Sequence, residues 1–288
     1  MTEYLDQQVK PSRYAIIRWF GFDQFEPERA FTSYWVSSKT FFIIRFIIAL
    51  YSTIVFWAHF GIAASASAAN IFFSYFTTLT FVGLHSYLVT ACVYHFRYLR
   101  NKNVDFMLNQ PSVLNYLFVY LYATVITNNV VTPVVYWSLL NQGTNGVPAI
   151  SVWTNVSVHG VSFFLMLIDV TFNRMKISIR MVLFAILTVV LYMFLAFIIF
   201  ANTGRWVYPF LRWSQGPITA LWYFVVAIIV VLSFFIMILV HRVRDMVARK
   251  TGRAEVSAMS EKVPDEETHQ DHSKLEANQS NITTTSQA

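Results

Sequence analysis

Three kinds of chemistry-bearing side chain occur at a similar depth in this sequence, inside its long apolar segments. Thr77 lies about 9 Å from the start of the second apolar segment, and His159 lies about 10 Å from the start of the fourth, at the rise of an α-helix. These two segments run in the same direction. The third segment runs the opposite way and carries Asn128 and Asn129 in the matching half. We therefore expect a hydroxyl, an imidazole and amide groups to lie near one level.

Such a group of side chains predicts nucleophilic chemistry. A threonine hydroxyl is a weak nucleophile on its own, and a neighbouring neutral histidine is the usual base that takes its proton. Amide or backbone N–H groups then stabilise the negative charge that develops on a substrate oxygen. His159 has no obvious acidic partner, because Asp169 lies too far along the same segment.

The fourth segment carries a polar stripe with helical spacing. Asn155, His159, Ser162, Met166 and Asp169 are separated by four, three, four and three positions, so they share one face of a helix. In a bundle this face points toward a polar cavity or toward partner helices. The structural alternative is that these groups form hydrogen bonds between helices and perform no chemistry.

The elements that carry these residues are predicted membrane spans. Of the 288 residues, 56% are hydrophobic and 12% are charged, whereas a soluble domain has about 25% charged residues. Six apolar segments are each long enough to cross about 30 Å of hydrocarbon. They are residues 41–59, 71–94, 113–140, 152–171, 181–201 and 217–240. The fold class is therefore all-α, a polytopic bundle of six transmembrane helices.

The chain divides into three predicted regions. Residues 1–39 form a cytosolic or interfacial N-terminal segment, 40–245 form the transmembrane domain, and 246–288 form a disordered acidic cytosolic tail. The third span is overlong and contains Pro133, so we expect it to tilt, kink or be partly unwound.

Basic residues orient the predicted bundle. One side of the membrane carries Lys10, Arg13, Arg18, Arg29, Lys39, Arg97, Arg100, Lys102, Arg174, Lys176, Arg180, Arg242, Arg244, Arg249 and Lys250. The loops on the other side carry only Arg205 and Arg212. Both termini are therefore predicted to be cytosolic.

Two charged residues inside the spans have structural interpretations. Arg45 lies near the cytosolic start of the first span and can extend its side chain to the interface. Asp169 lies near the cytosolic end of the fourth span, where Arg174 is close enough to compensate its charge partly.

The sequence predicts no cofactor and no nucleic-acid partner. His85 lies about 21 Å into the second span, too deep to share a haem or a metal ion with His159. The net charge of +6 comes from residues beside helix ends, where anionic lipids explain it. The expected partners are membrane lipids, with protein partners for the acidic tail as a further expectation.

Three short motifs suggest a family. The second span reads Tyr-Phe-Thr-Thr-Leu-Thr from Tyr75, the fourth reads Trp-Thr-Asn-Val-Ser-Val-His-Gly from Trp153, and the loop after the fifth reads Thr-Gly-Arg-Trp-Val-Tyr-Pro from Thr203. Together they resemble the androgen-induced and androgen-dependent family of multi-span proteins, over roughly residues 40 to 245. That family includes intramembrane hydrolases of fatty acid esters of hydroxy fatty acids. A looser resemblance is to the Rolling stone group, which implies no chemistry.

The resemblance implies a catalytic pair, a threonine and a histidine, at Thr77 and His159. Thr78 follows Thr77, so the nucleophile is ambiguous by one residue, and the flanking Val158 and Gly160 differ from the polar neighbour often found beside the family's histidine. The candidate residues for substrate binding or oxyanion stabilisation are Thr78, Asn128, Asn129, Asn155, Trp206 and Tyr208. For Trp206 and Tyr208 the alternative is an aromatic belt at the membrane interface.

We therefore expect an integral membrane lipid ester hydrolase that depends on Thr77 and His159. The substrate is expected to enter from the bilayer, and the expected location is the endoplasmic reticulum or another endomembrane, with the plasma membrane as the alternative. The alternative function is a non-catalytic scaffold, adhesion or trafficking protein. A transporter is less favoured, because the spans show no inverted repeat.

Overall fold

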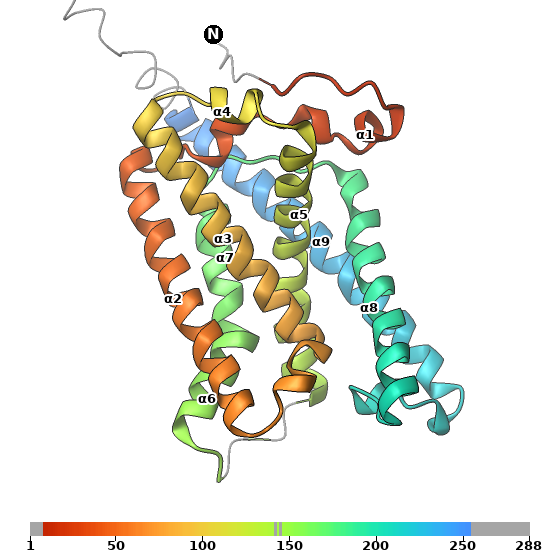
Figure 1. Cartoon of the computed structure of the whole chain (residues 1–288). Coiled ribbons are helices and arrows are strands. Elements are labelled where there is room, and N and C mark those ends of the chain that lie inside the picture. The colour runs from red at the N-terminus through yellow and green to blue at the C-terminus, as the bar shows by residue number, and fades with distance from the viewer. Residues whose placement is uncertain (1–7, 141–142, 144–145, 255–288) are drawn as a thin grey trace, which may run out of the picture.

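The chain folds into a bundle of long helices (Figure 1). The computed structural model describes residues 8–140, 143 and 146–254, and within these residues it is helical and contains no strand. The all-α prediction is therefore confirmed. The predicted tail beyond residue 254 lies outside the described residues.

Six helices of the described chain are long and apolar enough to cross a membrane, as predicted. They are Ser38–Ser65, Phe76–Asn101, Ser112–Leu140, Ala149–Phe172, Ile179–Thr203 and Ile218–Lys250. The last helix, α9 (Ile218–Lys250), continues ten residues beyond the predicted end of its span at residue 240. The chain is an integral membrane protein by the length and composition of these helices.

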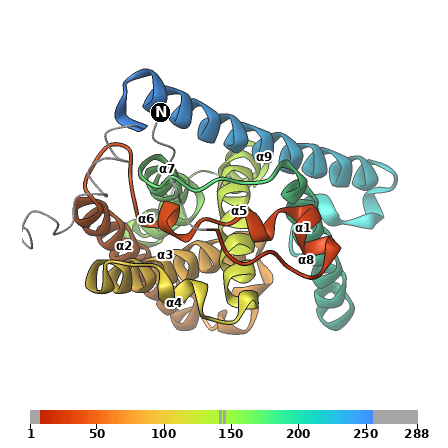
Figure 2. The same ribbon diagram turned by 90° about the horizontal axis from the view of Figure 1, so that it is seen from above.

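The third span occupies the centre of the bundle. It contains α5 (Ser112–Val135), and seen from above α3 (Phe76–Asn101) and α9 flank it on opposite sides (Figure 2). Of its most apolar stretch 72% is buried, against 11% for the span that contains α8 (Val182–Thr203). The polar residues of α5 are therefore interior residues, whereas α8 presents most of its apolar surface outward, as suits contact with lipid.

Two spans contain a π-helical turn. α5 continues into the π-helical segment η4 (Tyr136–Leu140), just after Pro133. In the fourth span the π-helical segment η5 (Ser157–Val161) separates α6 (Ala149–Val156) from α7 (Ser162–Phe172). A proline lacks an N–H group and disturbs the helical ladder, which explains the irregular end of the third span. Single π turns occur often at functional sites.

Local signals start and end several helices. α2 (Ser38–Ser65) begins after Ser37, whose hydroxyl accepts a hydrogen bond from the Thr40 N–H at 3.2 Å. α8 ends at Gly204, which has a φ of +67° and donates its N–H to the Phe200 carbonyl. Such a left-handed turn is readily adopted only by glycine, so it stops the helix at the lower end of Figure 1.

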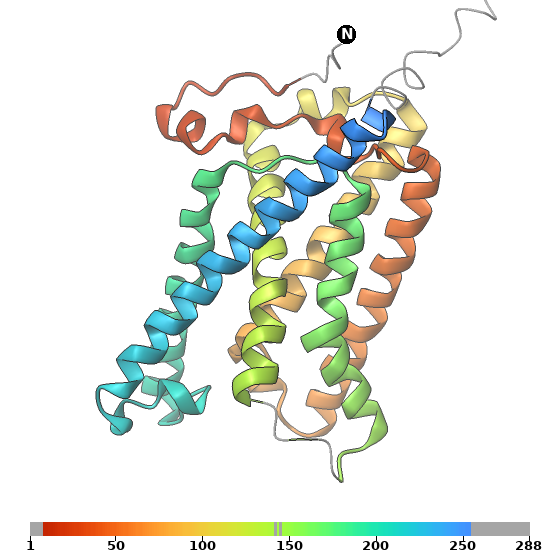
Figure 3. The ribbon, with the colours of Figure 1, turned by 180° about the vertical axis from the view of Figure 1, so that it is seen from behind.

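The N-terminal segment lies across the upper end of the bundle, the end at which the N-terminus is drawn (Figures 1 and 3). It comprises α1 (Ala15–Phe20), η1 (Phe22–Gln24) and η2 (Pro27–Ala30). Phe22 and Phe25 pack into the hydrophobic core, while Ile16 and Trp19 of α1 are largely exposed. The exposed α1 suits the interfacial position expected from the sequence, but the residues after it form part of the core.

A buried ion pair joins the first and fourth spans. The Arg45 Nε donates to Asp169 Oδ1 at 2.7 Å, and both side chains are almost completely buried. The Tyr87 hydroxyl donates to the other Asp169 oxygen at 2.7 Å. The expectation that Arg45 reaches the interface is therefore wrong. The partial compensation of Asp169 by Arg174 stays a prediction, and Arg174 donates to the Thr32 hydroxyl of the N-terminal segment, which covers this end of the bundle.

Candidate functional site

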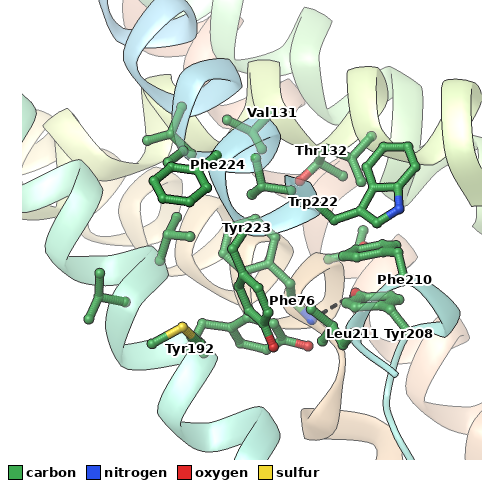
Figure 4. A pocket seen from close by; sticks show the side chains of 18 of the residues that line it. Phe76, Val131, Thr132, Tyr192, Tyr208, Phe210, Leu211, Trp222, Tyr223 and Phe224 are labelled. Carbon is green, nitrogen blue, oxygen red and sulfur yellow. Dashed lines mark hydrogen bonds between the residues drawn. The ribbon is translucent and has the colours of Figure 1, made fainter. Parts of the chain in front are cut away.

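Thr77 is one of the residues that line an apolar cavity, and Figure 4 shows the aromatic and aliphatic side chains of this lining. The cavity lies between α3, α5, α8 and α9 and is closed by the loop that follows α8. Its volume is about 250 Å³, and its lining is almost entirely aliphatic and aromatic. Besides Thr77 it includes Thr132, Tyr136, Tyr192, Tyr208 and Trp222. We call it the Thr77 cavity.

Thr77 is held at the first turn of α3 by Tyr208. The Tyr208 hydroxyl accepts a hydrogen bond from the Phe76 backbone N–H at 3.0 Å, and it lies close enough to Thr77 for the polar groups of Thr77 to influence its pKa. The first N–H groups of a helix have no partner inside the helix. Tyr208 therefore caps α3 from a loop distant in sequence, and it does so beside the candidate nucleophile.

Burial keeps the Tyr208 hydroxyl protonated. Loss of water around the ring raises its pKa above the ordinary tyrosine value, and the nearby polar groups of Thr77, Tyr192 and Phe76 oppose that shift only partly. A neutral hydroxyl both donates and accepts, so Tyr208 can pair with the Thr77 hydroxyl while it accepts from backbone N–H groups.

His159 lies in the π-helical turn η5, where one hydrogen bond and one stacking contact fix the orientation of its ring. Its Nδ1 pairs with the Asn155 carbonyl oxygen at 2.9 Å, and its ring stacks on Tyr136 with 3.7 Å between centroids. The Asn155 side-chain amide in turn donates to the Tyr136 hydroxyl. Because a carbonyl only accepts hydrogen bonds, Nδ1 carries the proton and Nε2 keeps its lone pair. His159 is therefore in the tautomer that a general base requires.

Tyr136 connects these two groups of residues. It lines the Thr77 cavity and it stacks on His159. Within the described residues, no hydrogen bond joins Thr77 to His159. The predicted site residues thus form two groups. Thr77 lies beside Tyr208 in one group, and His159 contacts Asn155 and Tyr136 in the other.

The other predicted site residues lie in different surroundings. Asn128 lines a second cavity, next to the first, whereas Asn129 donates to the Val125 carbonyl of its own helix at 2.8 Å. Thr78 is buried and does not line either cavity. Trp206 stacks on Phe200 of α8 with 4.2 Å between centroids. Of the two loop aromatics, Tyr208 therefore belongs to the wall of the Thr77 cavity and Trp206 does not.

Sequence reasoning missed Tyr136, Tyr192 and Trp222 as cavity residues. Tyr192 lines both cavities, and its hydroxyl donates to the Ser74 carbonyl just before α3 at 2.9 Å. Nothing in the periodicity distinguishes these three from the other aromatics of apolar spans. The π-helical turn at Tyr136 follows Pro133, which is the one local signal that pointed to this part of the third span.

Comparison with protein-family models, with curated proteins and with solved structures found no match. Among the described residues, no group of three or more histidine, cysteine, aspartate or glutamate side chains is arranged to hold a metal ion. What is established is the class defined by the fold, an integral membrane protein with six candidate spans.

Proposed function

We propose that this protein is an intramembrane hydrolase of lipid esters, with Thr77 as the nucleophile and His159 as the general base. The observation that carries the proposal is that Thr77 lies on the wall of an apolar cavity inside a membrane bundle. A cavity of this kind suits the acyl chain of a lipid that enters from the bilayer. The resemblance to the androgen-induced and androgen-dependent family supports the same pair of residues.

The first turn of α3 supports a role in stabilising an oxyanion. The Phe76 N–H points at the Tyr208 hydroxyl oxygen, 3.0 Å away, and Thr77 follows Phe76 in the same first turn of the helix. An ester oxygen in the place of the Tyr208 hydroxyl accepts the same hydrogen bonds. Backbone N–H groups directed at a developing negative charge are a principal source of catalysis in acyl transfer.

The proposed reaction proceeds in two steps. The Thr77 oxygen attacks the ester carbonyl while His159 Nε2 takes its proton, and that proton then passes to the alcohol as it leaves. A water molecule next attacks the acyl-threonine, gives a proton to His159, and releases the fatty acid as Thr77 regains its proton. The reaction requires that His159 approach Thr77. Tyr136 contacts His159 and lines the Thr77 cavity, so it lies between the two catalytic residues.

A non-catalytic multi-span protein that binds lipid is the second candidate. It is favoured by the surroundings of His159, whose ring bonds to the Asn155 carbonyl and stacks on Tyr136, with no hydrogen bond to Thr77 among the described residues. In that function the cavity holds a lipid, the polar residues of the spans hold helices together, and the chain acts as a scaffold, adhesion or trafficking protein.

A hydrolysis assay separates the two candidates. Purified protein in lipid nanodiscs is incubated with fatty acid esters of hydroxy fatty acids, and released fatty acid is measured beside labelling by a fluorophosphonate probe. We expect turnover and labelling, loss of both in Thr77→Val, and a rate at least about 100-fold lower in His159→Gln. Absence of turnover and labelling in the unaltered protein favours the non-catalytic candidate.

Thr78 and His85 provide matched control variants for the threonine and the histidine. Thr78→Val removes a buried hydroxyl one position further along α3, outside the cavity wall, and we expect it to keep activity. His85→Gln removes a histidine whose ring bonds to the Ser52 hydroxyl at 3.0 Å on another face of α3. If Thr78→Val abolishes labelling and Thr77→Val does not, Thr78 is the nucleophile and the assignment to Thr77 is wrong.

A further inference from the structure

A second cavity is lined by residues of three helices, α3, α5 and α8. Its volume is about 310 Å³. Phe76 and Tyr192 line both this cavity and the Thr77 cavity, so the two are adjacent. Leu191 at its rim is 55% exposed, which places the opening on the outer surface of the bundle. We call it the Asn128 cavity.

Asn128 is the unsatisfied polar group of this cavity. Its side chain is 95% buried, and its Oδ1 is enclosed without a hydrogen-bond partner among the described residues. A buried acceptor without a donor is rare, because it loses its hydrogen bond to water and gains none in return. Asn129 shows the contrast, since its amide donates within its own helix.

The other polar groups around the Asn128 cavity already have partners. Thr80 donates to the Thr77 carbonyl at 2.9 Å, and Thr124 donates to the Tyr120 carbonyl at 3.0 Å. The hydroxyls of Tyr120 and Thr188 pair with each other at 2.9 Å. The cavity therefore requires one further donor, at Asn128. None of the residues that line it is an acid, a base or a histidine.

We propose that the Asn128 cavity binds a neutral membrane lipid that carries a free hydroxyl, which donates to Asn128 Oδ1. The opening on the lipid-facing surface selects a ligand that arrives from the bilayer. The uncharged lining disfavours a phosphate or carboxylate head group, which is costly to bury without a partner. The single missing donor matches one hydroxyl, as in a sterol or a diacylglycerol. This inference does not depend on ester cleavage at Thr77.

Photocrosslinking in nanodiscs tests the proposal with two probes. One arm uses a photoactivatable sterol, and the other uses a photoactivatable diacylglycerol. Each is competed with the unlabelled alcohol and with its methyl ether, which has nearly the same shape but no donor. We expect saturable crosslinking to peptides within residues 76–83, 120–128 or 188–195, and about fivefold better competition by the alcohol, the effect of one neutral hydrogen bond. The arm that crosslinks identifies the lipid class.

Paired variants locate the acceptor. Asn128→Leu keeps a side chain of similar size without the acceptor, and it should abolish the preference for alcohol over ether. Asn129→Leu, one position along the same helix, should retain that preference. The proposal is overturned if neither probe crosslinks saturably at these peptides, if ether and alcohol compete equally in the unaltered protein, or if Asn128→Leu keeps the preference. The comparison of alcohol with ether needs no variant, so it holds even if Asn128→Leu does not fold.

Discussion

At the scale of single residues, the most consequential pairings join groups that are far apart in sequence. Arg45 meets Asp169 across 124 positions, and its Nη1 also donates to His95 Nδ1 at 3.2 Å. His95 then uses its other ring nitrogen to bond to the Ser38 hydroxyl at 3.0 Å. Because Arg45 only donates, His95 Nε2 carries the proton and donates to Ser38. This chain of bonds ties three helices together at the upper end of the bundle.

Asp169→Asn should destabilise the protein strongly. It leaves the Arg45 guanidinium buried without its counter-charge, and loss of one partner of a buried pair costs about 3–5 kcal/mol. The midpoint of thermal unfolding in detergent, with the unfolded fraction detected by its susceptibility to proteolysis, measures the loss of stability. The control is Asp105→Asn, which changes an exposed carboxylate on the short helix α4 (Asp105–Leu108) and should change the midpoint little. Equal midpoints for the two variants contradict the importance assigned to the ion pair.

At the scale of secondary-structure elements, a loop completes a helix that it does not adjoin. Tyr75, which precedes α3, makes no side-chain cap, and the Tyr208 hydroxyl from the loop after α8 takes that role. The π-helical turns η4 and η5, which belong to different spans, likewise contact each other through the stacked rings of Tyr136 and His159. The two candidate catalytic residues are thus positioned by different elements, and their relative position depends on how these elements pack.

Tyr208→Phe should lower stability by about 1 kcal/mol, because it removes the cap from the α3 N-terminus and leaves the Phe76 N–H without a partner. The unfolding midpoint in detergent measures this change. Tyr116→Phe on α5 removes a tyrosine hydroxyl that has no bonding partner among the described residues, so it should leave the midpoint unchanged. If both variants shift the midpoint equally, the cap contributes nothing specific.

At the scale of the whole molecule, six spans return the chain to the end from which it started. The N-terminal segment that contains α1 and the C-terminal end of α9 both lie at the upper end in Figures 1 and 3. The basic loops also lie at this end, and only Arg205 and Arg212 lie in the loops at the other. We propose on this ground that both termini are cytosolic.

Glycosylation tags test this orientation in cells. A tag inserted into the loop that joins the third and fourth spans should be glycosylated, because that loop faces the lumen in the proposed orientation. The same tag in the basic loop after the second span should remain unmodified. The opposite pattern reverses the orientation, and it also moves the Thr77 cavity into the cytosolic half of the membrane.

The sequence by itself determined the number of spans and the fold class. Runs of apolar residues are long enough to cross a bilayer whatever their neighbours are, so hydropathy predicted all six helices, with ends that differ by up to ten residues. Helical spacing likewise predicted that Asn155 and His159 share a face, and the structure joins His159 to the Asn155 carbonyl.

Only the tertiary structure decided which residues meet. Depth along parallel spans put Thr77 and His159 at one level, but depth does not state which face each helix turns toward its neighbours. Packing paired Thr77 with Tyr208, placed Tyr136 against His159, and separated Asn128 into a cavity of its own. It also paired Asp169 with Arg45, which lies 124 positions away in the sequence. The physical reason is that a buried polar group takes the partner that helix rotation and packing bring within about 3 Å, and that rotation is not encoded in local spacing.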